Sequence, residues 1–122
     1  MYVRHTYESL RTMHPHLISF TIDSTELACT QGGQLFRKMK SQHWKEVENK
    51  KNHSKGYNVI LINKSQYTRA KVILYAHGKI SLEDKNVNIY HINGNRLDCT
   101  IDNLTLTSAS DVINIHNKEI GS

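Results

Sequence analysis

Cysteine, proline and long apolar runs are scarce in this 122-residue chain, which has one proline and two cysteines. Cys29 and Cys99 are too few for a disulfide framework and lack the paired spacing of a zinc motif, so we expect reduced thiols, with Cys29 in a strand. No apolar run approaches the roughly 18 residues of a membrane-spanning helix, and the start of the chain lacks the apolar stretch of a signal peptide. These absences predict a soluble cytoplasmic protein with no membrane partner.

Positive charge is concentrated in the middle of the chain. Residues 37–71 hold ten basic residues and two acidic ones, a net charge of +8, whereas the segments before and after sum to −1 and −2. Such a stretch is typical of a protein that binds a polyanion, because each cation near a phosphate releases counterions. A merely solvated surface explains the charge equally well. The candidate binding residues are Arg37, Lys38, Lys40, Lys45, Lys50, Lys51, Lys55, Lys64, Arg69 and Lys71.

The first 20 residues have no single pattern. Leu10, Met13 and Leu17 have helical spacing, but Pro15 interrupts it, so a short broken helix and an extended arm fit equally well. The polar and charged residues 41–55 are expected to form a loop.

Two β-hairpins are expected in the middle of the chain. One pairs Leu27–Thr30 with Gln34–Met39 around a glycine pair able to make a tight turn. The other pairs Tyr57–Ile62 with Tyr67–Lys71 across residues 63–66.

A helical turn or two is expected after the second hairpin. It ends at Gly78, in the position favoured for a left-handed helix cap.

The last third of the chain predicts a strand, a loop, a strand and a helix. The strands are Val87–His91 and Leu104–Leu106, with an Asn93-Gly94 turn following the first of them. Residues 108–111 have the form of a capping box that opens a helix, whose apolar positions begin at Val112.

The stretch from Tyr90 to Leu104 carries a specific set of spacings. It resembles the HNH endonuclease family, in the branch of phage and intron homing nucleases, whose pattern is Asp-His, one residue, Asn-Gly, three residues, Asp-Asn-Arg, two residues and Asn-Leu. Six positions match without a gap: His91, Asn93, Gly94, Asp98, Asn103 and Leu104.

The resemblance implies an α+β fold, in which N-terminal β-hairpins precede a ββα-metal-type motif. It covers residues 26–118, although only the last third carries diagnostic residues. The family's His-Arg pair on the preceding helix is here Ala70-Lys71. The chain divides into an N-terminal arm or short helix at 1–25, a basic β-hairpin region at 26–80 and the HNH-like motif at 81–122, all expected in one compact domain.

The family's chemistry assigns roles to two residues. His91 is the general base that activates water, and Asn103 braces the loop that orients it. Without metal ligands around it, His91 can instead be a structural histidine, satisfied by Asp98 or by a backbone carbonyl.

The positions that should hold a divalent cation depart from the family. The carboxylate before the histidine is Tyr90, whose protonated phenol is a poor ligand for Mg²⁺, and the helix ligand is Val112, which has no donor atom. The family's Asn-Arg after Asp98 is Cys99-Thr100, so a cation that could touch phosphate is missing. Asp98 and Asp111 are the candidate substitutes, although Asp111 lies about 100° around the helix from Val112.

Three functions remain open. The first is a phage-type protein that binds double-stranded DNA through a degenerate HNH fold without cleavage or cofactor, in the host cytoplasm if a phage encodes it. The second is an active endonuclease or nickase that uses Mg²⁺ or Mn²⁺, with His91 as base. The third is a phage inhibitor or adaptor that binds a host protein. The sequence does not specify an oligomeric state.

Overall fold

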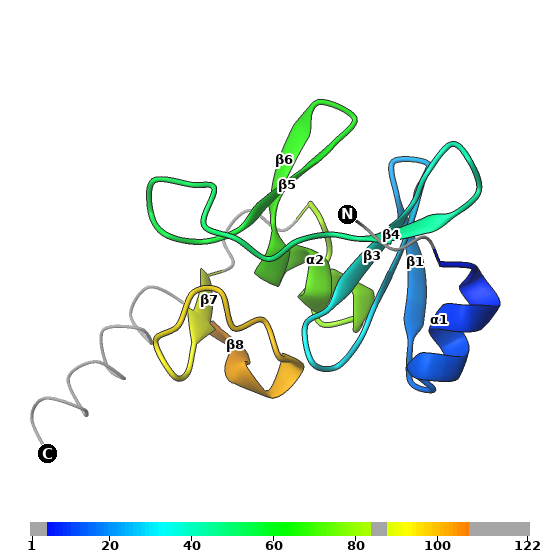
Figure 1. The fold of residues 1–122 in the computed structure, drawn as a ribbon. Coiled ribbons are helices and arrows are strands. Elements are labelled where there is room, and N and C mark those ends of the chain that lie inside the picture. The colour runs from blue at the N-terminus through cyan, green and yellow to red at the C-terminus, as the bar shows by residue number, and fades with distance from the viewer. Residues whose placement is uncertain (1–4, 84–87, 108–122) are drawn as a thin grey trace, which may run out of the picture.

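The computed structural model describes residues 5–83 and 88–107. Its first half contains one helix and a four-stranded antiparallel sheet: α1 (Tyr7–Met13), β1 (Ile18–Ile22), β2 (Thr25–Cys29), β3 (Leu35–Lys38) and β4 (Trp44–Glu46). Its second half contains a hairpin, a helix and a second antiparallel pair: β5 (Val59–Ile62), β6 (Ser65–Thr68), α2 (Arg69–Ala76), β7 (Asn88–His91) and β8 (Leu104–Thr107) (Figure 1).

This arrangement confirms the expected α+β fold, with hairpins first and a strand, loop and strand near the end. A short 3-10 turn at Ile101–Asn103 leads directly into β8. The helix expected from residue 108 onward lies outside the described residues. None of the helices in the described ranges is long and apolar enough to cross a membrane.

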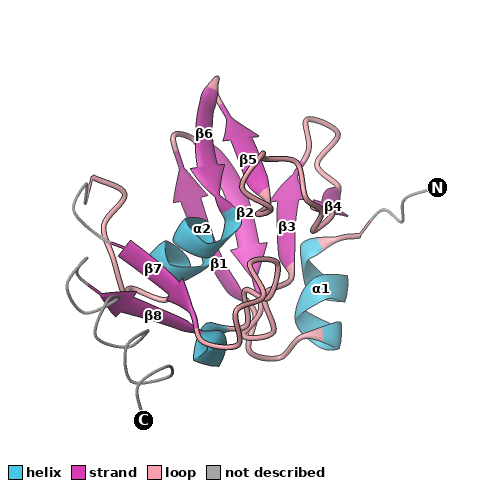
Figure 2. Ribbon diagram, turned by 90° about the vertical axis from the view of Figure 1, so that its left-hand side faces the viewer, coloured by secondary structure: helices cyan, strands magenta, loops and turns pink. Residues whose placement is uncertain are grey.

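The four-stranded sheet has an apolar layer on each face, because successive side chains of a strand point to opposite sides. Leu27, Cys29 and Leu35 belong to the main core cluster, together with the buried residues of α2. Ala28 and Phe36 belong to a second cluster that includes the buried face of α1. The sheet therefore lies between the two helices, as Figure 2 shows.

From residue 5 onward, the start of the chain forms the short helix α1 and the strand β1, so of the two expectations for this segment the short helix is the one observed. Thr6 caps α1 by accepting a hydrogen bond from the Ser9 N–H at 3.1 Å, and the helix ends before Pro15. β1 then pairs with β2 across a two-residue turn, Asp23-Ser24, with φ angles of 49° and 67°. The expected segment boundary after residue 25 falls within this hairpin.

The second hairpin turns earlier than the sequence predicts. Asn63 and Lys64 both have positive φ, 48° and 69°, and Ile62 pairs with Ser65. This is the geometry of a two-residue hairpin turn whose twist suits the flanking strands. The four-residue connection is wrong, so the strand begins at Ser65 and the chain is already helical at Arg69.

The end of α2 and the start of the following loop agree better with the sequence. Gly78 has a φ of +72° just beyond the helix, as expected of a left-handed cap. The polar segment 41–55, by contrast, is not all loop, because Trp44–Glu46 forms β4 and Trp44 also bridges to His5. Residues 47–58, which follow β4, form the irregular segment called here the basic loop.

Residues 99–101 pack against the connection between β2 and β3. Ile101 donates its backbone N–H to the Gln31 carbonyl oxygen at 2.8 Å. Gly33, with a φ of +87°, lies so close to Cys99 that a Cβ atom would stand 2.8 Å from the Cys99 carbonyl carbon. Cys29 and Cys99 are both buried free thiols in the main core, as expected, and burial raises their pKa values to about 12 and about 11.

Candidate functional site

The loop between β7 and β8, residues 92–103, is called here the motif loop, and it folds around the side chain of Asn103. Asn103 Oδ1 accepts the Asn93 backbone N–H at 2.9 Å, and Asn103 Nδ2 donates to Asn93 Oδ1 at 3.0 Å and to the Asp98 carbonyl oxygen at 2.8 Å. The Ile92 N–H adds a bond to the Asn103 carbonyl oxygen at 2.9 Å. One amide side chain therefore joins the start, middle and end of the motif loop.

The carboxylate of Asp98 is an acceptor inside the same loop. Its Oδ2 accepts from Asn93 Nδ2 at 2.7 Å, and its Oδ1 accepts the Thr100 backbone N–H at 3.2 Å. Hydrogen bonds from Thr100 are the main cause that holds the pKa of Asp98 below its ordinary value, and Asn93 and the neighbouring His91 lower it further. Asp98 is therefore ionised at neutral pH and oriented by its own loop.

His91 is the last residue of β7 and is half-buried. Its Nε2 atom is buried and has no hydrogen-bond partner within residues 5–83 and 88–107, so that atom makes neither of the bonds considered for a structural histidine. Burial is the main cause that lowers the pKa of the imidazole; the positive charge of Arg96 lowers it further, and Asp98 opposes both. The ring is uncharged at neutral pH, as a general base must be, but one of its nitrogens is closed to solvent.

Within residues 5–83 and 88–107, the side chains around His91 do not assemble a site for a divalent cation. Tyr90, also half-buried, places a phenol where the family has a carboxylate, and a phenol is a poor ligand for a hard cation. Asp98, one candidate substitute, is already fixed by Asn93 and Thr100. Across residues 5–83 and 88–107, no three His, Cys, Asp or Glu side chains gather as a metal site. Val112 and Asp111 lie outside the described residues.

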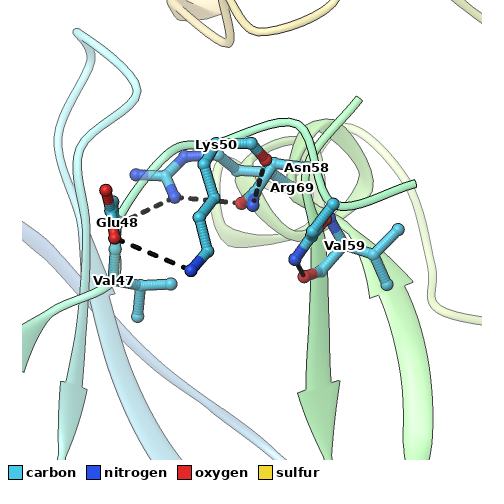
Figure 3. Close-up of polar contacts among 7 residues, drawn as sticks. Val47, Glu48, Lys50, Asn58, Val59 and Arg69 are labelled. Carbon is cyan, nitrogen blue, oxygen red and sulfur yellow. Dashed lines mark hydrogen bonds and ion pairs between the residues drawn. The ribbon is translucent and has the colours of Figure 1, made fainter. Parts of the chain in front are cut away.

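Arg69 is a buried structural residue, and its assignment to a binding surface is corrected. Only 2% of it is exposed. Its Nε atom donates to the Gly33 carbonyl oxygen at 3.1 Å. Its Nη1 atom donates to the Val47 carbonyl oxygen at 3.0 Å and to Asn58 Oδ1 at 3.2 Å (Figure 3). Burial also lowers the pKa of its guanidinium. Arg69 therefore ties the first residue of the basic loop to the sheet and to α2.

Two asparagines fix the rest of the basic loop. Asn58 is itself 2% exposed, and its Nδ2 atom donates to the Lys50 carbonyl oxygen at 2.9 Å. Asn52 bonds both backbone groups of Val59, accepting the N–H at 2.6 Å and donating to the carbonyl oxygen at 2.9 Å. The lysines of the basic loop are thus carried on a backbone that three polar side chains hold in place (Figure 3).

The basic loop and the motif loop are in contact. Asn49 Nδ2 donates to the Leu97 carbonyl oxygen at 2.5 Å, and Arg96 Nη1 donates to the Lys55 carbonyl oxygen. The fold thus brings together two features that lie more than 40 residues apart in the chain. We call this contact the loop junction, formed by residues 49–55 and 95–97.

The other candidate basic residues are distributed over several surfaces. Arg37 Nη1 donates to the Leu61 carbonyl oxygen at 2.8 Å. Lys38 pairs with Glu26 at 3.0 Å, and Lys50 pairs with Glu48 at 3.8 Å. Six further lysines are exposed or half-buried: Lys40, Lys51, Lys55 and Lys64 are exposed, whereas Lys45 and Lys71 are half-buried.

Half of the candidate basic residues line one open groove of about 1120 Å³ between the first sheet and the β5–β6 hairpin: Arg37, Lys38, Lys40, Lys45 and Lys50. Three glutamates also line it: Glu26, Glu46 and Glu48. The lining residues that belong to the basic loop are Val47, Glu48, Lys50, Asn52 and Asn58. The basic loop therefore borders this groove and also contacts the motif loop.

Arg96 is the residue that reasoning from the sequence missed. It is exposed and is the only lysine or arginine between residues 86 and 117. It occupies one of the three variable positions between Asn93-Gly94 and Asp98, so the family pattern does not single it out. The sequence feature that could have identified it is that it is the one basic residue in an otherwise uncharged or acidic stretch.

A comparison with protein families identifies one match in this region. Residues 67–112 match the family model described as HNH endonuclease. The match begins within β6 and continues through α2, β7, the motif loop and β8. No curated protein and no solved structure matches the chain.

Proposed function

Because residues 67–112 belong to the HNH endonuclease family, whose members act on nucleic acid, we propose that this protein is a phage-type DNA-binding protein that uses the HNH scaffold without cleaving. The observation that carries the proposal is the position of the basic loop, which borders the groove and contacts the motif loop. The partner is double-stranded DNA, and no cofactor is needed.

Binding on this surface rests on charge. The lysines of the basic loop and Arg96 are exposed, and phosphate contacts by such cations release counterions without reading the base sequence. The groove is less strongly basic, because Glu26, Glu46 and Glu48 offset part of its charge. We therefore assign the strongest phosphate contacts to the loop junction and expect binding that is largely independent of sequence.

The loss of cleavage rests on the donor atoms around His91. Phosphodiester hydrolysis in this family uses a cation to stabilise charge on the scissile phosphate, and a histidine without that cation cannot supply this electrostatic stabilisation. Tyr90 lacks the carboxylate, Val112 lacks any donor, and the His91 Nε2 atom is buried. These three features leave the motif loop as a fold element beside a basic surface.

Fluorescence anisotropy with a short random-sequence duplex tests binding. With about four phosphate contacts, from three basic-loop lysines and Arg96, the slope of log affinity against log salt is about −3.6, or about a hundredfold loss between about 50 and 200 mM salt. The double variant Lys51→Gln/Lys55→Gln should lose about two units of that slope. The matched control Arg11→Gln/Lys79→Gln removes the same charge at exposed positions outside the candidate binding residues and should bind like wild type. Salt-insensitive binding, or no binding at low salt, contradicts the proposal.

A plasmid nicking assay with Mg²⁺ or Mn²⁺ tests the absence of cleavage. Wild type and His91→Ala should both leave supercoiled plasmid intact. Metal-dependent nicking by wild type that disappears in His91→Ala would establish instead the alternative of an active endonuclease or nickase.

A further inference from the structure

We propose that Arg96 is a phosphate-binding residue that holds one strand of the duplex against the loop junction, beside His91. This inference rests on the proposed DNA binding and adds to it a specific contact. The ligand is a phosphodiester of the DNA backbone. Arg96 supplies from the motif loop the cation that the family pattern places after Asp98 and that Cys99-Thr100 lacks here.

The position of the Arg96 guanidinium supports this role. Its Nη1 atom donates to the Lys55 carbonyl oxygen, which places the charged group over the contact between the two loops. This is the one hydrogen bond of the Arg96 side chain within the described residues, so four of its five N–H donors remain for a ligand. A guanidinium with free donors binds phosphate through two parallel hydrogen bonds, which a lysine cannot do.

The charge at the junction is not neutralised from within the described chain. The two ion pairs of residues 5–83 and 88–107 involve Lys38 and Lys50, and neither involves Arg96, Lys51 or Lys55. Three exposed cations therefore belong to one short stretch of surface with no carboxylate paired to them. Such an arrangement costs electrostatic energy in the free protein and is relieved by a polyanion.

The junction is also ordered in advance of binding. Arg69, Asn58 and Asn52 fix the basic loop, and Asn103 fixes the motif loop. A site whose backbone is already ordered loses less conformational entropy when a ligand binds. Arg96 can thus set the register of a DNA strand relative to His91, in addition to contributing charge.

The test compares Arg96→Gln with Lys79→Gln in the full chain, by anisotropy with the same duplex over a range of salt. Both changes remove one exposed positive charge, but Lys79 follows α2 and makes no contact with the junction within the described residues. Arg96→Gln should weaken binding about tenfold and make the salt slope shallower by about 0.9, whereas Lys79→Gln should change affinity less than about twofold. Arg96→Lys should keep the salt slope and lose part of the affinity, because it keeps the positive charge but cannot make two parallel hydrogen bonds to phosphate.

The outcomes separate the two proposals. If wild type binds and Arg96→Gln matches Lys79→Gln, the role of Arg96 is overturned and DNA binding stands. If Arg96→Lys loses as much slope as Arg96→Gln, Arg96 acts by joining the two loops rather than by its charge, which also overturns the phosphate contact. If wild type binds no duplex at low salt, both proposals fail. Thermal melting of each variant confirms that the comparison is made between folded proteins.

Discussion

Replacement of Gly33 by alanine should separate the motif loop from the first sheet. Gly33 lies between β2 and β3 with a φ of +87°, and a Cβ atom there would stand 2.8 Å from the Cys99 carbonyl carbon, 2.9 Å from its oxygen and 3.0 Å from the Thr100 nitrogen. All three contacts are with backbone atoms, which cannot rotate away as a side chain can. One of the two segments must move.

The expected cost has two parts. A non-glycine residue at positive φ costs about 1 kcal/mol, and forcing an extra carbon into a packed contact costs about 1–3 kcal/mol. Gly56→Ala is the matched control, because Gly56 has nearly the same φ, +85°, and a Cβ atom there would meet nothing within 4 Å. We therefore expect Gly33→Ala to lower the free energy of unfolding by about 2–4 kcal/mol and Gly56→Ala by about 1 kcal/mol.

Urea unfolding of the two variants measures this difference directly, because equal slopes allow midpoints to be compared. Motif-loop displacement should also make Cys99, which is 3% exposed in the wild type, react faster with a thiol reagent in Gly33→Ala than in Gly56→Ala. Equal stabilities for the two variants would refute the close approach of Gly33 to Cys99, and with it the docking of the motif loop on the sheet.

Two further outcomes follow from the buried charge and from the histidine. Arg69→Met should lower the free energy of unfolding, measured in urea, by about 3 kcal/mol, because three acceptors lose a charged donor. Lys71→Met on the same helix should change that free energy by less than about 0.5 kcal/mol. Equal effects of the two variants would contradict the buried hydrogen-bond network of Arg69. Burial and the charge of Arg96 lower the pKa of His91 from 6.5 in the folded protein. As the pH falls, the unfolded chain therefore takes up a proton on His91 before the folded protein does. The contribution of the neutral His91 to folding stability is complete above pH 6.5 and is lost as the pH falls from that value towards the folded pKa. An NMR titration of the imidazole should show that Arg96→Gln raises the pKa of His91 and that Asp98→Asn lowers it. An unchanged pKa in Arg96→Gln would mean that Arg96 is too far from His91 to affect its charge.

The strands that the sequence failed to predict differ in how much signal they carried. In residues 18–22, Ile18, Phe20 and Ile22 alternate with polar residues, which is the pattern of a half-buried strand. The helical spacing around Pro15 led instead to the prediction of a broken helix or an arm. β4 has only one apolar residue, Trp44, so its sequence lacks the alternation of apolar and polar residues that predicts a strand. Its pairing with β3 depends on tertiary context that a three-residue window does not contain.

The first of two hairpin turns was not predicted from the sequence, and the second was predicted two residues too long, for the same physical reason. Asp23-Ser24 and Asn63-Lys64 contain no glycine, yet all four residues adopt positive φ. Asp and Asn tolerate this region because their short side chains bond locally, and the twist of the paired strands selects it for both turn residues. A search for glycine therefore misses such turns and displaces the following strand and helix.

Arg69 shows the limit of reading charge from sequence. Arginine is almost never fully buried unless it has partners, so its assignment to the surface was the natural one. Its partners are two backbone carbonyls and one asparagine, from Gly33, Val47 and Asn58, which the fold gathers from separate segments. No local spacing encodes that arrangement, and the same is true of the contact between Arg96 and Lys55.

The family pattern and the family's chemistry need not persist together in this chain. Asn93, Asp98 and Asn103 all make hydrogen bonds that close the motif loop. Folding of the loop therefore accounts for these residues whether or not the protein cleaves DNA. The positions that discriminate between the two functions are Tyr90 and Val112, which replace the family's metal ligands, and Arg96, which adds a cation, and we propose that these differences favour binding DNA over cleaving it.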